Sequence, residues 1–312
     1  MSFTTDVKAE IAANELHTCC QRAQLCALIQ MCSTLNFTSD GMHIRVQTEN
    51  ANTAKRIWKM IKEMYGVDTQ LSVLRKMKLK KNHIYVIRIV NKVTQILEDL
   101  EIFTQGGLQT HPSMRMLRKE CCARAYLAGA FLACGSVNSP QKANYHLEIS
   151  TNSEELAKFI QKIMLKFDMP AKYIRRRNKE VIYLKASDKI GDFLRYIGAS
   201  DALFVFEDSR IQRDFMNSLT RLDNCELANE MKSISAGKKQ LEDIEWIENY
   251  QGIQTLPEKL QMVVALRKEF PEASLNELCE SYSQVYHEKI SKSGMKHRLH
   301  KLHEIANQYR SE

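Results

Sequence analysis

The alternation of hydrophobic and polar residues predicts short strands and amphipathic helices along the chain. Residues 43–48 read His-Ile-Arg-Val-Gln-Thr, with an apolar side chain at every second position until the last, which is the period of a strand with one buried face. Residues 127–135 are apolar nearly all round a helix, which is typical of a helix buried on every side. The chain therefore mixes strands with at least one fully buried helix.

The same series of elements occurs twice. The matching segments are 19–28 with 121–130, 43–48 with 146–151, 54–57 with 157–160, and 84–87 with 181–184. Each half predicts the order αββαββα, so we expect an α+β domain of two halves related by a pseudo-twofold axis. Small residues in the first helix of each half, Ala27 and then Ala128 and Gly129, predict that these two helices pack together at the centre.

Beyond the duplication, the chain predicts a long helix and then an all-α domain. Ser274 with Glu277 three residues later forms a capping box, and Gly252 marks the end of the preceding long helix. We expect a duplicated domain over 1–205 (halves 15–105 and 117–200), a linker helix over 206–254, and a helix-turn-helix domain over 255–312.

Composition narrows the class of protein. Of 312 residues, 44% are hydrophobic and 26% charged, which is typical of a globular protein, and no apolar run reaches the ~20 residues of a membrane span. The first residues carry acids and no apolar core, so we expect no signal peptide, a cytoplasmic protein and reduced cysteines. With 45 Lys and Arg against 37 Asp and Glu, the net charge of +8 favours nucleic acid as the partner.

The last predicted helix is the basic one that a helix-turn-helix requires. Between residues 289 and 303 there are Lys, Arg and His residues and no acid. Candidates for base and phosphate contacts are Ser291, Lys292, Ser293, Lys296, His297 and Arg298, with Lys301 placed for a backbone phosphate. The alternative is a small helical bundle with an incidental basic face.

A second set of basic residues lies in the third predicted strand of each half. These candidates for phosphate contacts are Arg75, Lys76 and Lys78 in the first half and Arg175, Arg176 and Arg177 in the second. Equivalent positions in both halves suit a surface that follows a duplex. The alternative is a pair of solvated hairpin tips.

The two first helices resemble the LAGLIDADG motif of homing endonucleases. That family has twin motif helices between two saddle-shaped halves, and the last acid of each motif binds the catalytic metal. Laid on this chain, these positions are Cys32 and Cys134, and a thiol is a poor ligand for Mg²⁺. We therefore expect a non-catalytic protein with no cofactor and no small-molecule substrate. The alternatives are an active, divergent DNA endonuclease and an adaptor that uses the saddle for protein contacts.

The order of the parts adds a closer resemblance. Together with residues 221–232 and the Ser-Lys-Ser-Gly run before His297, it resembles the WhiA family of Gram-positive bacteria. The resemblance implies a DNA-binding regulator of transcription, linked to sporulation in filamentous species and to cell division and chromosome segregation in others. It also implies double-stranded DNA as the partner and a nucleoid-associated location, and we expect a regulatory protein partner and no membrane contact.

Two clusters of cysteine and histidine residues raise the question of a metal site. Cys19–Cys20 and Cys121–Cys122 begin the equivalent helices, and the pseudo-twofold axis would bring both starts together. Adjacent residues point about 100° apart on a helix, so buried packing thiols are the favoured interpretation. His297, His300 and His303 have helical spacing, which fits phosphate or solvent contacts better than a metal. We therefore predict no metal.

Overall fold

The computed structural model describes residues 2–38, 41–75, 83–142 and 144–310. The chain divides into two compact units, Met1–Gln212 and Arg213–Glu312. Helix α8 (Ser200–Tyr250) begins in the first unit and ends in the second. It crosses the limit predicted at residue 205 without a break, and the predicted limits of the three parts stay predictions. Among the described residues, no helix is both long and apolar enough to cross a bilayer.

The first half of the first unit is a four-stranded antiparallel sheet with helices on one side. Its elements are α2 (Thr18–Cys32), β1 (Ser33–Thr38), β2 (Gly41–Thr48), α3 (Ala51–Tyr65), β3 (Gln70–Arg75), β4 (His83–Ile89) and α4 (Val93–Asp99). The strand order is β1-β2-β4-β3. Buried Ile44 and Val46 of β2 and Ile87 of β4 belong to the core of the unit, as the alternating pattern predicts.

The second half repeats this arrangement. Its elements are α5 (Glu120–Cys134), β7 (Gly135–Val137), β8 (Leu147–Thr151), α6 (Glu154–Lys166), β9 (Lys172–Arg176), β10 (Lys179–Leu184) and α7 (Ser187–Tyr196). The strand order β7-β8-β10-β9 matches that of the first half, which confirms the predicted duplication. The structure adds helix α1 (Phe3–Ala13) and a short hairpin of β5 (Phe103–Thr104) and β6 (Gly107–Leu108), which the sequence did not predict.

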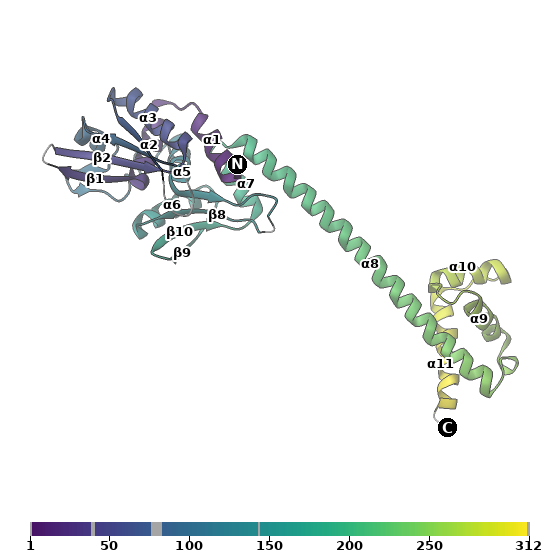
Figure 1. Cartoon of the computed structure of the whole chain (residues 1–312). Coiled ribbons are helices and arrows are strands. Elements are labelled where there is room, and N and C mark those ends of the chain that lie inside the picture. Colours follow the sequence, from purple (N-terminus) through teal and green to yellow (C-terminus); the bar gives the residue numbers. More distant parts are fainter. Residues whose placement is uncertain (1, 39–40, 76–82, 143, 311–312) are drawn as a thin grey trace. The chain divides into compact units, whose positions relative to one another are not determined.

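Helices α2 and α5 lie side by side between the two sheets (Figure 1). At Gly129 a Cβ atom would lie 2.5 Å from the carbonyl oxygen of Gln24 and 3.0 Å from the Cβ of Ala27, so only glycine permits this approach. Leu28 of α2 and Leu132 of α5 are fully buried in the same core. The prediction that the two motif helices pack together at the centre is confirmed.

The second unit is a helical domain built on the end of α8. Its other elements are η1 (Ile253–Thr255), α9 (Glu258–Glu269), α10 (Leu275–Tyr286) and α11 (Lys292–Arg310). Ile244 and Ile247 of α8 are buried in the same core as Leu260 and Leu299, so α8 is part of this fold. The capping box of Ser274 and Glu277 is present as predicted.

Candidate nucleic-acid interface

Helix α11 has one buried apolar face and one exposed basic face. Its buried residues are Met295, Leu299, Leu302 and Ala306. At its start, the Ser291 hydroxyl accepts a hydrogen bond from the Gly294 amide at 3.1 Å. The predicted contact residues that lie exposed are Ser291, Lys292, Ser293, Lys296, His297 and Lys301. The first two turns therefore present hydroxyls, two ammonium groups and an imidazole to solvent, beside the positive end of the helix dipole.

Arg298 differs from the other predicted contact residues. Its guanidinium carbon lies 5.0 Å from the centroid of the buried Tyr282 ring on α10, a cation–π arrangement. Its Nη1 atom is buried and makes no hydrogen bond among the described residues. The period of α11 turns position 298 towards α10, so Arg298 is less exposed than the other predicted contact residues, and its contact with DNA stays a prediction.

An ion-pair cluster holds α11 against α8. The buried Asp243 carboxylate accepts a hydrogen bond from His303 Nδ1 at 2.8 Å and forms an ion pair with the Arg310 guanidinium at 2.9 Å. His303 is therefore a positioning residue for α11, and not a partner of His297 and His300 in a metal site. No sequence pattern marks this cluster, because Asp243 is one of several acids along a charged helix.

In the second half, the predicted basic residues point in different directions. The Arg175 guanidinium lies 3.4 Å from the Glu180 carboxylate, which also accepts a hydrogen bond from the Tyr173 hydroxyl at 2.5 Å. That hydrogen bond raises the pKa of Tyr173 to about 12. Arg176 pairs with Lys179 across the hairpin on the opposite face of the sheet, and Arg177 forms the turn at φ 49°. Arg175 thus lies on the helix-covered side of the strand, because successive strand residues alternate, and its predicted phosphate contact stays a prediction.

In the first half, Arg75 is exposed at the end of β3, and Lys76 and Lys78 lie outside the described residues. The uncovered face of this sheet carries Arg45 of β2, which pairs with Arg88 of β4. Arg88 and, on the uncovered face of the second sheet, Lys172 are basic groups that lie outside the basic runs of the sequence. Only the strand register shows them.

The ends of the two motif helices meet beside a lysine. The thiols of Cys32 and Cys134 share a hydrogen bond, which raises the pKa of Cys32 and lowers that of Cys134 to about 7. The Lys8 ammonium of α1 contributes to the lowering at Cys134, and burial lowers the pKa of Lys8 itself. Lys8 also lies 5.9 Å from the centroid of the Phe131 ring. A cationic side chain thus lies where the resemblance places a metal ion.

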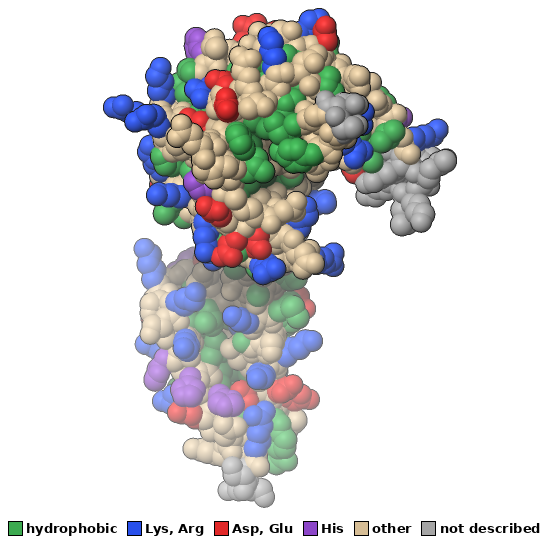
Figure 2. All heavy atoms as spheres, turned by 90° about the vertical axis from the view of Figure 1, so that its left-hand side faces the viewer, with side chains coloured by type: hydrophobic (Ala, Val, Ile, Leu, Met, Phe, Trp, Pro, Cys, Tyr) green, Lys and Arg blue, Asp and Glu red, His purple; other side chains and the backbone are tan. Residues whose placement is uncertain are grey.

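On the face shown in Figure 2, Lys, Arg and His side chains gather over the second unit, with a few acidic side chains among them. The fold and these surfaces define a protein with a duplicated LAGLIDADG-like domain and a C-terminal helix-turn-helix domain. Three family models match in chain order: the WhiA N-terminal LAGLIDADG-like domain at residues 18–103, the WhiA LAGLIDADG-like domain at 123–216, and the WhiA C-terminal HTH domain at 219–306. The chain belongs to the WhiA family.

Individual relatives agree with this assignment. The probable cell division protein WhiA of Bacillus cereus strain B4264 is 44% identical over 312 residues, covering all of this chain and 98% of the relative. The corresponding protein of Oceanobacillus iheyensis is 44% identical over 307 residues, covering 98% and 97%. The crystal structure of full-length WhiA from Thermatoga maritima has a TM-score of 0.60 at 22% identity, with 99% of each chain covered, which shows the shared fold.

Proposed function

We propose that this protein is a non-catalytic DNA-binding regulator of transcription that acts in cell division. The exposed, basic N-terminal half of α11 is the observation that carries the proposal. Curated relatives bear the name of a probable cell division protein, and the second unit matches a helix-turn-helix model. Chromosome segregation, a role in sporulation in filamentous relatives, and association with the nucleoid belong to the same proposal, as does a regulatory protein partner.

The geometry of α11 supports major-groove binding. In a helix-turn-helix, the N-terminal residues of the second helix of the motif contact base edges. Lys296 and His297 are exposed one turn into α11, where a side chain reaches a base. Ser291, Lys292 and Ser293 surround the helix start, where backbone amides and the dipole favour a phosphate. Lys301 lies two turns further along α11, where it is placed for a phosphate of the DNA backbone.

Crosslinking of the tagged protein to the chromosome, followed by sequencing, tests the proposal and supplies its target duplexes. Fluorescence anisotropy with such a duplex and a scrambled one then separates specific from general binding. We expect Lys296→Ala to lose ~1–3 kcal/mol of discrimination if it contacts a base. Lys259→Ala, a change at an exposed lysine of α9, is the matched control and should bind as wild type does. Unchanged affinity and specificity in Lys296→Ala and His297→Ala together would reject α11 as the reading helix.

We propose that the uncovered sheet faces follow the duplex backbone through Arg45 and Arg88 in one half and Lys172 and Arg176 in the other. Each lost phosphate contact reduces the slope of log affinity against log salt by about 1. The double variant Arg45→Ala/Arg88→Ala in the full chain should therefore flatten this slope by about 2. An unchanged slope would favour the adaptor, in which the saddle contacts protein and the second unit alone holds DNA.

We propose that the motif ends have no nuclease chemistry. Cys32 and Cys134 supply sulfur where Mg²⁺ requires oxygen, and the Lys8 ammonium repels a divalent ion. Incubation of the pure protein with supercoiled plasmid and Mg²⁺ or Mn²⁺ should leave the plasmid intact. Cleavage that Lys8→Ala abolishes, or that depends on either cysteine, would instead support the divergent endonuclease.

A further inference from the structure

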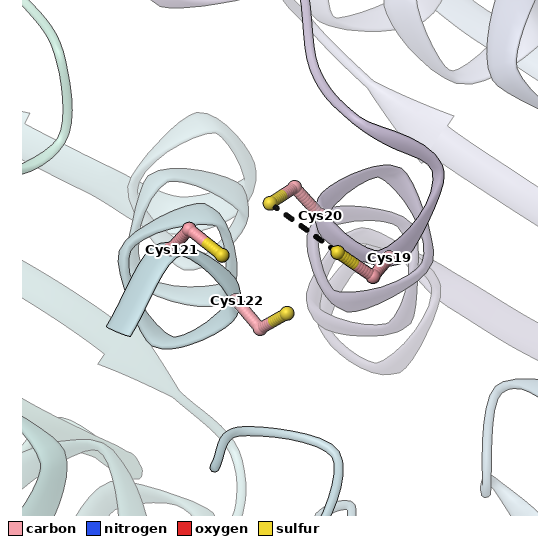
Figure 3. Close-up of side chains that lie close together, drawn as sticks. All are labelled: Cys19, Cys20, Cys121 and Cys122. Carbon is pink, nitrogen blue, oxygen red and sulfur yellow. Dashed lines mark hydrogen bonds between the residues drawn. The ribbon is translucent and has the colours of Figure 1, made fainter. Parts of the chain in front are cut away.

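Four cysteines from the two halves converge at the start of the motif helices. Cys19 and Cys20 lie in the first turn of α2, and Cys121 and Cys122 in the first turn of α5. Their four Sγ atoms all lie within 4.8 Å of one another, and those of Cys19 and Cys20 are 3.9 Å apart. Figure 3 shows the four side chains directed into the space between the two helices.

We propose that this cluster is a metal site, in which one divalent cation that prefers sulfur, Zn²⁺ above all, is bound by the four thiolates. Tetrahedral zinc with metal–sulfur bonds of ~2.3 Å has its sulfurs about 3.8 Å apart. The distance between Cys19 and Cys20 already matches that edge, and the other distances exceed it by no more than about 1 Å. An iron–sulfur cluster has bridging sulfides and several irons between its ligands, so it needs a wider set of cysteines than this one.

The vicinal arrangement does not prevent chelation. Two neighbouring Cα–Cβ bonds diverge by about 100° around a helix, but each thiol can rotate about its χ1 angle. At the first turn no preceding helical turn restricts that rotation. The Sγ atoms of Cys19 and Cys20 therefore approach each other although one side chain is exposed and the other buried.

The surroundings favour bound thiolates and give an ion access. Neither His17, before α2, nor Lys119, before α5, caps its helix with a side chain, so two positive helix ends face the cluster. These ends offset the net charge of −2 that a divalent ion with four thiolates carries. One surface pocket is lined by Cys19 and Cys122 and another by Cys20 and Cys121, so the cluster borders a pocket on each of two sides.

Each half supplies two of the four ligands, so the ion would join the halves at the pseudo-twofold axis. On binding, each thiol that is still protonated releases its proton to solvent, and no electron is transferred. The site lies at the opposite end of α2 and α5 from Cys32 and Cys134. It is therefore separate from the degenerate motif ends.

Titration of the reduced, chelator-treated full chain with Co²⁺ tests the site. We expect one cobalt per chain, with intense ligand-field bands of tetrahedral cobalt, sulfur-to-cobalt charge transfer, and displacement of the cobalt by Zn²⁺. The variant Cys19→Ser/Cys121→Ser changes two exposed thiols and should lose these bands at equimolar cobalt. The matched control Cys32→Ser/Cys134→Ser changes the pair at the other end of the same helices and should keep them.

A second measurement needs no variant. Zn²⁺ should protect Cys19 and Cys121 from alkylation in the wild-type chain by at least tenfold, while the exposed Cys225 reacts at the same rate with and without the ion. The proposal is overturned by a wild-type chain that binds no cobalt, by equal spectra in the two double variants, or by anaerobically purified protein that holds iron and labile sulfide. Loss of two hydrogens in the intact mass under reducing conditions, which indicates a disulfide, would also overturn it. None of these readouts involves DNA, so their failure leaves the proposed function standing.

Discussion

Each unit of the chain has a glycine at a close backbone contact and a charged side chain packed among its elements, but the two units use these features differently. In the first unit, Gly129 lets two equivalent helices touch along their backbones, and the charge is Lys8 beside two thiols. In the second, Gly237 of α8 touches the loop at Pro271, and one buried charge is Asp243 with two basic partners. In the duplicated unit, Lys8 lowers the pKa of the Cys134 thiol. In the second unit, Asp243 holds α11, the helix that we propose binds the major groove, through His303 and Arg310.

The largest expected effect is at the duplicated interface. Gly129→Val would place atoms within 2.5 Å of the Gln24 carbonyl, and a helix cannot shift locally to relieve this contact. We expect a loss of about 3 kcal/mol or more in the free energy of unfolding, at the upper end for overpacking. Amide hydrogen exchange should accelerate in α2 and α5 and stay unchanged in α10. Gly106→Ala, with neighbours no closer than 3.7 Å, is the control.

The equivalent change in the second unit should cost less. A Cβ atom at Gly237 would lie 2.3 Å from the Pro271 carbonyl oxygen, but Pro271 lies in a turn, which can adjust more easily than a packed helix. We expect Gly237→Val to destabilise the second unit by about 2 kcal/mol. Faster exchange in α9 to α11, with no change in α2 and α5, would confirm that the two contacts are independent. Faster amide hydrogen exchange in both units would show that the contacts at Gly129 and Gly237 are not independent.

A smaller effect is expected at the cap of α10. The Ser274 hydroxyl accepts a hydrogen bond from the Glu277 amide at 3.3 Å, while Glu277 accepts one from the Ser274 amide. Ser274→Ala should cost about 1 kcal/mol in denaturant unfolding, followed by circular dichroism. The hydrogen bond from Ser274 lowers the pKa of Glu277. A carboxylate with a lowered pKa stabilises the fold above its unfolded pKa. The Ser274 amide, the main donor to Glu277, is kept in Ser274→Ala, so variant and wild type should both lose this contribution as the pH falls through acidic values.

The smallest effect concerns reactivity rather than folding. Cys134 has a pKa lowered to about 7 by its hydrogen bond with Cys32 and by Lys8, so the thiolate is populated at neutral pH. Lys8→Met removes the positive charge, which should raise this pKa and move the pH profile of Cys134 alkylation to higher pH. Mass spectrometry of the modified peptide measures the profile, with Cys225 as the internal reference and Lys59→Met as the control. A profile that does not move would show that Lys8 leaves the thiol pair unaffected.

Periodicity and repetition were enough to predict the main elements. The spacing of apolar residues and the match between the halves predicted αββαββα twice, and small residues at 27, 128 and 129 predicted the central helix pair. The capping box of α10 at Ser274 and Glu277 was equally predictable, because it depends on residues three positions apart. Helix α1 was missed because its buried residues, Val7 and Ile11, form a single pair four positions apart, which is too short a pattern to indicate a helix by itself.

The candidate contact residues were only partly predictable. Strand alternation placed Arg175 against Glu180 and Arg176 on the opposite face, although both belong to one basic run. Helix periodicity likewise separated Arg298 from Lys296. A basic run in the sequence shows where charge is concentrated, but the direction of each side chain depends on a register that neighbouring strands and helices set.

The amino-acid sequence by itself determined the elements, the duplication, the family and the thiols at both ends of the motif helices, because each follows from local spacing or from repetition. Tertiary structure alone decided which distant groups meet. It brought four cysteines from two halves within 4.8 Å, put Lys8 beside Cys134, and joined Asp243 to His303. Contacts of this kind depend on the angles at which whole helices pack, and no short stretch of residues specifies those angles.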